Sequence, residues 1–474
     1  MLFSTAAVLM LTFFSLHLYF SMIVKPARIR KFLRQQGING PPPKILLGNI
    51  LDVEKSRDAA EKAPLNHPHP PLIHNTAAVL PFAEEWRQQY GPLYVFSLGK
   101  MQVLYVNDPD LVKEITTCMS LDLGKPLYQQ TVLRPLIGKG IQPSNGSAWA
   151  RQRKLIAPEL FMDKVKGMMS IITESGLALV DSWKHKVESE AGGVVEIGVD
   201  QCMKRFSGDI ISRACFGSSY SEGQEIFLKL DILQEIVSKG ILSVLGIPGL
   251  SCLPTKTNRQ IWALDKQISA LILKVVKERN IYSAGFQTSA VSASWSLMLL
   301  ASNPEWQTRV RDEVEEVCQG RIPDTDMLRK MKQLHMVIQE TMRLYPSAAT
   351  LGREALKDMK IGNILVPKGV NIWTTVTALH TNTALWGTDA LEFKPQRFEN
   401  GIVGACKSPN AYMPFGFGPR ACVGQHLVMV ELKLLMALIL TNFSFTLSPN
   451  YVHSPVTKII IEPKHGVHIM VKKL

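Results

Sequence analysis

Cys422 and its neighbours have the residue types that could hold and tune a metal cofactor. Ten residues ending at Gly424 read FGFGPRACVG, and an apolar helix candidate follows from Gln425 to Leu440. A cysteine at a helix start is suited to be a thiolate, because unpaired N–H groups and the helix dipole stabilise the anion. Gly418 and Gly424 let the backbone turn tightly and approach a flat macrocycle, and Arg420 could pair with an anionic group on it. An isolated cysteine in this position is more often a small buried hydrophobe.

The whole segment resembles the cysteine-loop signature of the cytochrome P-450 superfamily. It matches F-x-x-G-x-R-x-C-x-G at every specified position. The resemblance implies a haem-thiolate enzyme that binds haem b, with Cys422 as the axial ligand of the iron. It also implies cofactor contacts from four more residues, Phe415, Gly418, Arg420 and Gly424.

Glu340 and Arg343 lie three residues apart, on one face of a helix candidate, where they can pair. Such pairs are common on any solvated helix. In order and spacing, however, they resemble the E-x-x-R of the superfamily, and Pro395–Phe398 resembles the motif whose arginine, here Arg397, completes a Glu-Arg-Arg cluster. The resemblance gives this cluster a structural role near the haem and no role in bond making.

Trp149 and Arg153 lie four residues apart, so both can point to one side of a helix and donate hydrogen bonds to an anion. The pair resembles the W-x-x-x-R of the superfamily, which implies that it binds a haem propionate. A tryptophan packed on the core beside a solvated arginine is the alternative.

Residues 284–289, AGFQTS, resemble the A-G-x-[DE]-T-[TS] of the central I helix and imply Thr288 and Gln287 as the catalytic pair. The Thr288 hydroxyl both donates and accepts, so it can hold a water and help deliver protons to the reacting oxygen. Gln287 fills the usual acidic position but cannot ionise. Proton relay through that side chain is therefore in doubt.

The chain departs from the superfamily most at the join between Asn280 and Ile281. A helix candidate from Arg259 to Asn280 runs straight into the AGFQTS motif, so the N-terminal half of the I helix is missing. Either neighbouring residues substitute for it or the distal pocket is deformed. Around Ile281 to Glu316 the chain resembles the plant 714 family, some members of which oxidise gibberellins.

The N-terminus predicts a membrane anchor. The segment from Leu2 to Val24 contains no charge and only one imidazole, His17. It is long enough for a transmembrane helix. A cleaved signal peptide is the competing interpretation. Five basic residues follow without an acidic one, and the positive-inside rule places the rest of the chain in the cytosol. They are Lys25, Arg28, Arg30, Lys31 and Arg34.

Composition excludes several other classes of protein. The seven cysteines contain no C-x-x-C pair, so neither a zinc site nor a disulfide framework is predicted. The formal charge of +13 is scattered and not interleaved with aromatics, which argues against nucleic acid. A basic face for anionic lipid or an acidic protein partner fits better.

We expect three regions and a mainly α fold with a smaller β-rich part, the cytochrome P-450 fold behind an N-terminal membrane helix. Residues 1–24 are the anchor, 25–43 a basic flank with a proline-rich hinge, and 44–474 the haem-binding catalytic domain. Residues 93–98 and 102–106 predict a β-hairpin. The stretch from Asp52 to Pro71 predicts a surface loop. His67, His69 and His74, in and just after it, could bind a metal, but the prolines among them favour an ordinary loop.

The implied activity is a monooxygenase that inserts one oxygen atom from O2 into an apolar small molecule, such as a diterpenoid or gibberellin-like metabolite. Two electrons would come from an NADPH-dependent flavoprotein reductase. The anchor implies an endoplasmic reticulum membrane protein that crosses the membrane once, with a cytosolic catalytic domain. Because the I helix is shortened, a haem-binding pseudoenzyme or a haem-thiolate isomerase or dehydratase is the alternative.

Overall fold

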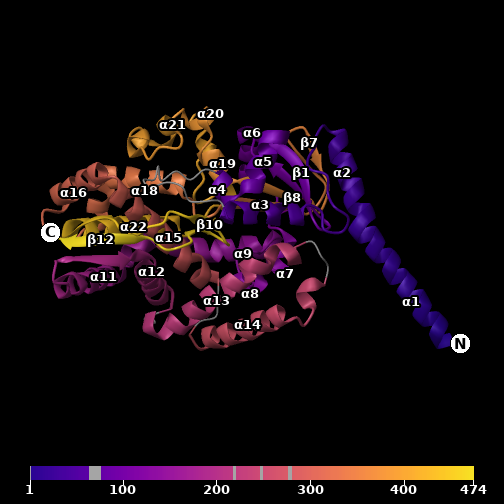
Figure 1. Ribbon diagram of the computed structural model, residues 1–474, viewed down its shortest axis with the longest axis horizontal. Helices are drawn as coiled ribbons and strands as arrows, with labels where there is room; N and C mark the ends of the chain where they lie inside the picture. Colours follow the sequence, from indigo (N-terminus) through magenta and orange to yellow (C-terminus); the bar gives the residue numbers. More distant parts are fainter. Residues whose placement is uncertain (1, 63–75, 217–219, 246–248, 276–279) are drawn as a thin grey trace.

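The N-terminal segment is one long helix that projects from the body of the protein. The computed structural model describes residues 2–62, 76–216, 220–245, 249–275 and 280–474. Helix α1 (Leu2–Tyr19) continues through a π-helical turn, η1 (Phe20–Val24), into α2 (Lys25–Gln35). Figure 1 shows this helix in indigo, with its N-terminus far from the other elements. The stretch Val8–Gln35 contains an apolar window long enough to cross a membrane, and none of that window is buried inside the protein.

The helix extends further than the sequence predicts. It does not stop at Val24 but includes 11 residues of the basic flank. Lysine, arginine, alanine and leucine are good helix formers, and no glycine interrupts them before Gly37, where φ is +85°. The extended, proline-rich hinge therefore begins after a rigid basic helix.

The β-rich part is built mainly from a five-stranded sheet in the order β1-β2-β8-β5-β3. The predicted hairpin is confirmed, with Leu98 opposite Met101. Strands β2 and β8 are parallel, and the other pairs are antiparallel. The strands of this sheet are β1 (Leu93–Leu98), β2 (Met101–Val106), β3 (Leu123–Gly124), β5 (Thr350–Ala355) and β8 (Asn371–Thr375). The smaller sheets comprise β4 (Val194–Gly198), β6 (Met359–Ile361), β7 (Ile364–Val366), β9 (Phe443–Leu447), β10 (Pro455–Thr457), β11 (Ile461–Pro463) and β12 (His468–Lys473).

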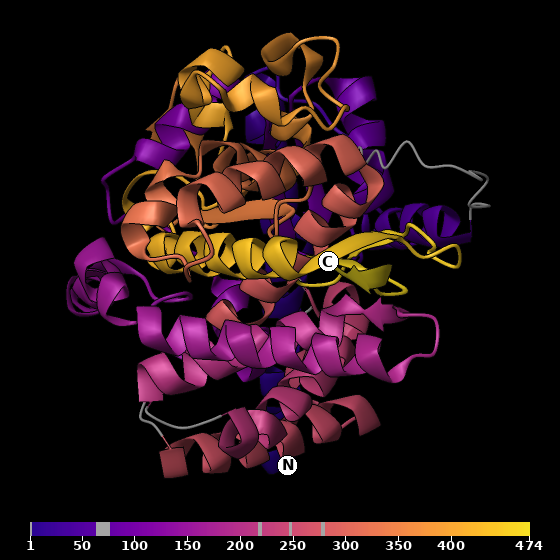
Figure 2. The ribbon, with the colours of Figure 1, turned by 90° about the vertical axis from the view of Figure 1, so that its left-hand side faces the viewer.

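The rest of the body is helical and is organised around α22 (Gln425–Asn442). Although α22 is apolar enough to pass for a membrane span, 72% of its apolar window is buried. Figure 2 shows it in yellow, with orange helices above it and magenta helices below. Its neighbours include α11 (Met169–Ser189), α15 (Asn280–Ser302), α16 (Pro304–Cys318) and α18 (Lys332–Leu344). Helix α22 is therefore a core helix.

Helices α12 to α14 lie with α11 in the lower part of the body in Figure 1. Their bounds are α12 (Val199–Phe216), α13 (Tyr220–Val244) and α14 (Lys256–Val275). The other helices of at least five residues are α3 (Ile50–Lys62), α5 (Pro81–Tyr90), α6 (Pro109–Thr117), α7 (Leu127–Thr131), α9 (Gly146–Ile156), α10 (Met162–Gly167), α17 (Thr325–Lys330), α19 (Val376–His380) and α21 (Gly401–Ala405). Single turns form α4 (Thr76–Val79), α8 (Arg134–Ile137) and α20 (Thr383–Trp386). Short 3-10 turns are η2 (Ala157–Leu160), η3 (Leu250–Cys252), η4 (Pro395–Phe398), η5 (Pro409–Ala411) and η6 (Gly418–Arg420).

One local prediction from the sequence is wrong. Asp52 to Lys62 is not a loop but part of α3, where alanine, glutamate and lysine favour a helix and Val53 is buried. The helix predicted from Arg259 to Asn280 is confirmed as far as Val275, where the described part of α14 ends, and residues 276–279 lie outside the described residues. His67, His69 and His74 lie outside the described residues.

Candidate functional site: a cysteine loop and a group of cations

The loop that leads to Cys422 is held by two glycines with left-handed backbone conformations. Gly416 and Gly418 both have φ +69°. A Cβ on Gly418 would collide with the carbonyl oxygen of Thr116, at the end of α6. Glycine at 418 is therefore required for packing against α6, which the sequence could not indicate. The loop closes where the N–H of Cys422 donates to the carbonyl oxygen of Phe415 at 2.8 Å.

The Cys422 side chain is accessible although protein surrounds its thiol. Its side chain has exposed surface. Nevertheless, burial raises the pKa of the thiol, and the N–H of Gly424 and the charge of Arg153 lower that pKa by less. Both observations hold together if the sulfur faces an accessible space that protein encloses on most sides. The N–H of Gly424 acts in the predicted direction, and a bound metal cation would stabilise the thiolate further.

Arg420 points from the cysteine loop toward α9. Its guanidinium donates to the carbonyl oxygen of Ser144 at 3.0 Å and to Oδ1 of Asn145 at 3.3 Å. It also lies over the ring of Trp149, 4.2 Å from the centroid. Trp149 therefore supports Arg420 through a cation–π contact, which the spacing of Trp149 and Arg153 did not predict.

Arg153 joins the same group from α9. Its guanidinium donates to the carbonyl oxygen of Ala421, next to Cys422. Burial lowers the pKa of Arg153, and the nearby Cys422 thiolate would raise it. The structure thus brings Trp149, Arg153 and Arg420 together beside the cysteine, as the resemblance predicts for a propionate site.

Two further cations belong to this group, although the sequence did not single them out. Arg353, on β5, is only 6% exposed, and burial together with Arg420 lowers its pKa to about 10. Burial, Arg353 and Arg420 also hold the pKa of Lys125 well below its usual value. Burial and Arg153 lower the pKa of Arg420 to about 10. Each of these shifts includes repulsion from another cation of the group.

No carboxylate neutralises these cations within the described part of the chain, where none of Lys125, Arg153, Arg353 and Arg420 forms an ion pair. Buried charges normally require a partner of opposite sign. These cations therefore suit an anionic ligand, and the two carboxylates of haem b would be such partners. The accessible cysteine and these four cations fit haem.

The Glu340 carboxylate binds two arginines in the interior. Arg343 donates to it through Nε at 2.6 Å and Nη2 at 2.8 Å, and both side chains are fully buried. Arg397 donates to Oε1 of Glu340 at 3.2 Å and to Oδ1 of Asp389 at 3.0 Å. The three predicted residues therefore meet. Asp389 is a fourth member that the sequence did not reveal, and its hydrogen bonds with Lys394 and Arg397 lower its pKa to about 2.

Thr288 and Gln287 point in different directions from α15. The Thr288 hydroxyl donates to the carbonyl oxygen of Ala284 at 2.6 Å, one turn earlier. Ala284 is exposed and Thr288 half-buried, so this face of the helix borders accessible space. The Gln287 side chain is buried and donates through Nε2 to Oδ1 of Asp231, on α13, at 2.8 Å. Gln287 therefore contacts a carboxylate on another helix and does not lie beside the Thr288 hydroxyl.

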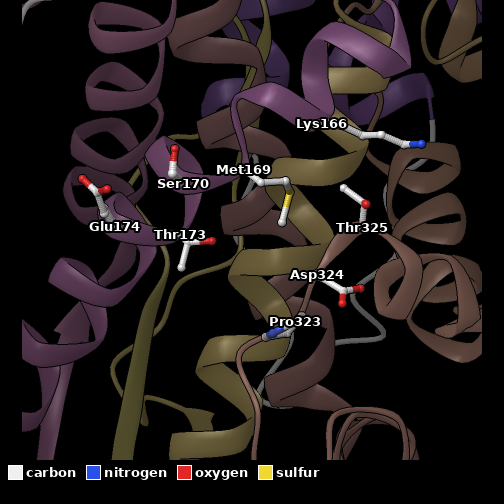
Figure 3. Close-up of a pocket in the computed structure, with 8 residues that line it drawn as sticks. All are labelled: Lys166, Met169, Ser170, Thr173, Glu174, Pro323, Asp324 and Thr325. Carbon is white, nitrogen blue, oxygen red and sulfur yellow. The ribbon is translucent and has the colours of Figure 1, made fainter.

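A separate surface groove of about 500 Å³ lies between the start of α11 and the start of α17 (Figure 3). None of the candidate residues line it. Its lining residues are Lys166, Met169, Ser170, Thr173, Glu174, Pro323, Asp324 and Thr325. This groove is therefore distinct from the cysteine site.

Comparison with known proteins identifies the class of protein that has this fold and site. A family model described as Cytochrome P450 matches residues 70–281 and 279–470. The chain belongs to the cytochrome P450 family. Membership makes it a haem b-dependent monooxygenase, an oxidoreductase with a mainly helical fold.

Its relatives narrow the placement to the plant 714 family. Cytochrome P450 714C2 of Oryza sativa subsp. japonica is 45% identical over 500 residues, covering 97% of this chain and 95% of the relative. Cytochrome P450 714A2 of Arabidopsis thaliana is 39% identical over 507 residues, covering 96% of this chain and 95% of the relative. The predicted resemblance is confirmed.

The comparisons also support the prediction that part of the I helix is missing. The two matched pieces of the family model meet at residues 279–281, where the sequence predicts the loss of helix. The alignment with the rice relative runs over 500 positions, more than the 474 residues of this chain. The relative therefore has segments that this chain lacks.

Proposed function

We propose that Cys422 is the axial ligand of the haem iron in a membrane-anchored monooxygenase that oxidises an apolar small molecule. The observation that supports this proposal most strongly is the accessible side chain of Cys422 with four cations grouped near it, none of which forms an ion pair in the described part of the chain. Lys125, Arg153, Arg353 and Arg420 would hold the propionates. Haem, when bound, supplies the activation of O2.

The protein itself orients the substrate and controls protons. Ala284 and Thr288 border accessible space on α15, and Thr350 and Leu351 are half-buried at the start of β5. These side chains would form part of the substrate wall. Because the Thr288 hydroxyl both donates and accepts, it would hold a water that carries protons to the reacting oxygen. Phe415 and Gly424 would position the sulfur from either side of the loop.

The substrate we propose is a diterpenoid or gibberellin-like plant metabolite. The likeness to the 714 family supports this class, together with the apolar character expected of a substrate for such a pocket. An NADPH-dependent flavoprotein reductase would supply the electrons. The basic surface, with a net charge of +13, favours an acidic partner of this kind.

Thr288→Ala is expected to increase severalfold the hydrogen peroxide released per NADPH consumed, because the water that delivers protons loses its hydroxyl partner. Peroxide, NADPH and product should be measured in the same reductase-supplemented reaction. Thr288→Ser keeps a hydroxyl and is the matched control. Equal coupling in the alanine variant and the unmodified protein would remove Thr288 from the mechanism.

We further propose that the protein resides in the endoplasmic reticulum membrane, crosses it once, and has a cytosolic catalytic domain. Deleting residues 1–24 is expected to make the protein extractable by alkaline carbonate without loss of haem, because α1 is exposed and apolar and makes no part of the core. Some peripheral binding through the basic helix α2 should persist. A truncated protein that still resists carbonate would show that another segment inserts into the membrane.

The shortened I helix is expected to make the protein a poor catalyst even when haem binds. The haem-binding residues lie outside the join at Asn280 and Ile281, but the wall of the substrate pocket depends on the missing turns. An ångström-scale misplacement of a reacting group can reduce a rate about a hundredfold. Inserting a relative's segment at this join should therefore raise turnover per bound haem by up to about a hundredfold.

Product formation should be normalised to bound haem in membranes that contain the same reductase and the same substrates. A segment of equal length made of glycine and serine is the control for spacing alone. Equal turnover per haem in the chain with and without the relative's segment would show that the shortened helix is tolerated.

A further inference from the structure

Three helices meet at the carboxylate of Asp231. Oδ1 accepts from Nε2 of Gln287, on α15, at 2.8 Å. Oδ2 accepts from Nζ of Lys204, on α12, at 2.8 Å. Gln287 is 7% exposed, and the side chains of Lys204 and Asp231 are 21% and 28% exposed. One carboxylate on α13 therefore links α12 and α15 at the edge of the interior.

The same turn of α15 has other close contacts with α12 and α13. The ring of Phe286 stacks on that of Phe227, with centroids 4.3 Å apart. The Ser207 hydroxyl donates to the carbonyl oxygen of Gly285 at 3.0 Å. A Cβ at Gly285 would collide with the side chain of Ile211, so α12 approaches α15 as closely as glycine allows. The residues directly before Thr288 are thus fixed laterally and not only along their own helix.

The lateral contacts reach the residues that directly precede Thr288. Gln287 is its immediate neighbour, and Gly285 and Phe286 complete the same helical turn. Backbone hydrogen bonds within a helix run along its axis, so they do not fix where the helix lies against its neighbours. The hydrogen bonds of Asp231 therefore supply a restraint that α15 cannot supply by itself.

We propose that Asp231 is the positioning residue that fixes the turn of α15 carrying Thr288, acting through the amide of Gln287. The effect of this positioning on catalysis by Thr288 rests on the proposed function. A direct proton path from Asp231 to Thr288 is less well supported, because successive residues of a helix point about 100° apart. Asp231 contacts Gln287, whereas the Thr288 hydroxyl bonds to Ala284.

The chemistry of the three groups provides a specific test. In Asp231→Ala, Gln287 and Lys204 both lose the carboxylate that they share. In Gln287→Glu, two carboxylates face each other. In the double variant Gln287→Glu/Asp231→Asn, the asparagine can accept from Lys204 and donate to the glutamate, and the pattern is complementary again. Each single variant should therefore loosen the turn of α15 that carries Thr288, and the double variant should hold it in place again.

Hydrogen exchange of the backbone amides in residues 284–289 measures the position of this turn without any catalysis. In the full-length haem-loaded protein, each single variant should exchange about tenfold faster than the unmodified protein, and the double variant should return to within about twofold. Glu235→Gln is the matched control, since it breaks an exposed ion pair with Lys239 on the same helix and should change nothing. Unchanged exchange in both single variants, or no recovery in the double variant, would overturn the proposal.

Peroxide released per NADPH separates this proposal from the function of Thr288. If both hold, the single variants should increase peroxide as Thr288→Ala does, and the double variant should restore coupling. If exchange changes and recovers as expected but Thr288→Ala itself has no effect, Asp231 still positions the helix and the proposed role of Thr288 fails. If Thr288→Ala uncouples the reaction and the Asp231 variants do not, the positioning role is wrong.

Discussion

Replacing Cys422 with serine is expected to abolish the thiolate-type Soret band of the reduced carbon monoxide complex. Serine offers no sulfur donor, and its hydroxyl does not ionise near neutral pH as a metal-bound thiol does. The four cations that would hold the propionates stay intact in this variant. The band should therefore disappear even in the fraction of protein that retains haem.

Cys422→His separates loss of the ligand from loss of the haem. Its imidazole can bind iron, so haem should remain and the spectrum should change to that of a nitrogen ligand. Cys252→Ser is the control, because Cys252 is an exposed free cysteine on η3, outside the loop. A thiolate-type band in either Cys422 variant would show that another residue provides the sulfur.

Replacing Glu340 with alanine is expected to lower the free energy of unfolding by about 3–5 kcal/mol, because two arginines would lose the carboxylate that they share. Glu340 and Arg343 are fully buried, and the side chain of Arg397 is 7% exposed. Glu340 also accepts from the N–H of Lys394 at 2.9 Å, which ties α18 to the segment before η4. The expected loss is a large fraction of the stability of a typical protein.

Unfolding by denaturant, followed by fluorescence, measures this change, and haem content should fall in parallel. Glu340→Gln keeps an acceptor and should be affected less than the alanine variant. Glu305→Gln is the control, since it breaks an exposed pair with Arg309 and should change stability by less than about 1 kcal/mol. A loss below about 1 kcal/mol for Glu340→Ala would mean that the cluster does not support the fold.

The sequence predicts the parts of the site that lie within short motifs. The cysteine loop, the Glu340 pair and the Trp149 pair each depend on spacing along one segment, so the residues could be named without a structure. The mainly α fold and the hairpin were predicted for the same reason, since their patterns are local. The correct placement of Arg397 beside Glu340 depended on family resemblance and not on spacing.

What the sequence could not predict depends on burial and on contacts between distant segments. Lys125 and Arg353 are ordinary basic residues until the fold places them beside Arg420. The helix start beside Cys422 is visible in the sequence, but the burial that raises the pKa of its thiol is not. From the sequence, Gln287 indicated only that the usual acid of this motif is absent. In the structure, its amide donates to the carboxylate of Asp231, which lies 56 residues earlier in the chain.

The most direct test of the proposed monooxygenase is to follow the oxygen atom. Membranes that contain the full-length protein and a flavoprotein reductase should be supplied with NADPH, isotopically labelled O2 and apolar plant metabolites, and the products analysed by mass spectrometry. We expect products that carry one labelled oxygen atom and form only with NADPH and reductase. Products that form without NADPH, or that contain no labelled oxygen, would contradict the proposal and favour a haem-thiolate isomerase or dehydratase.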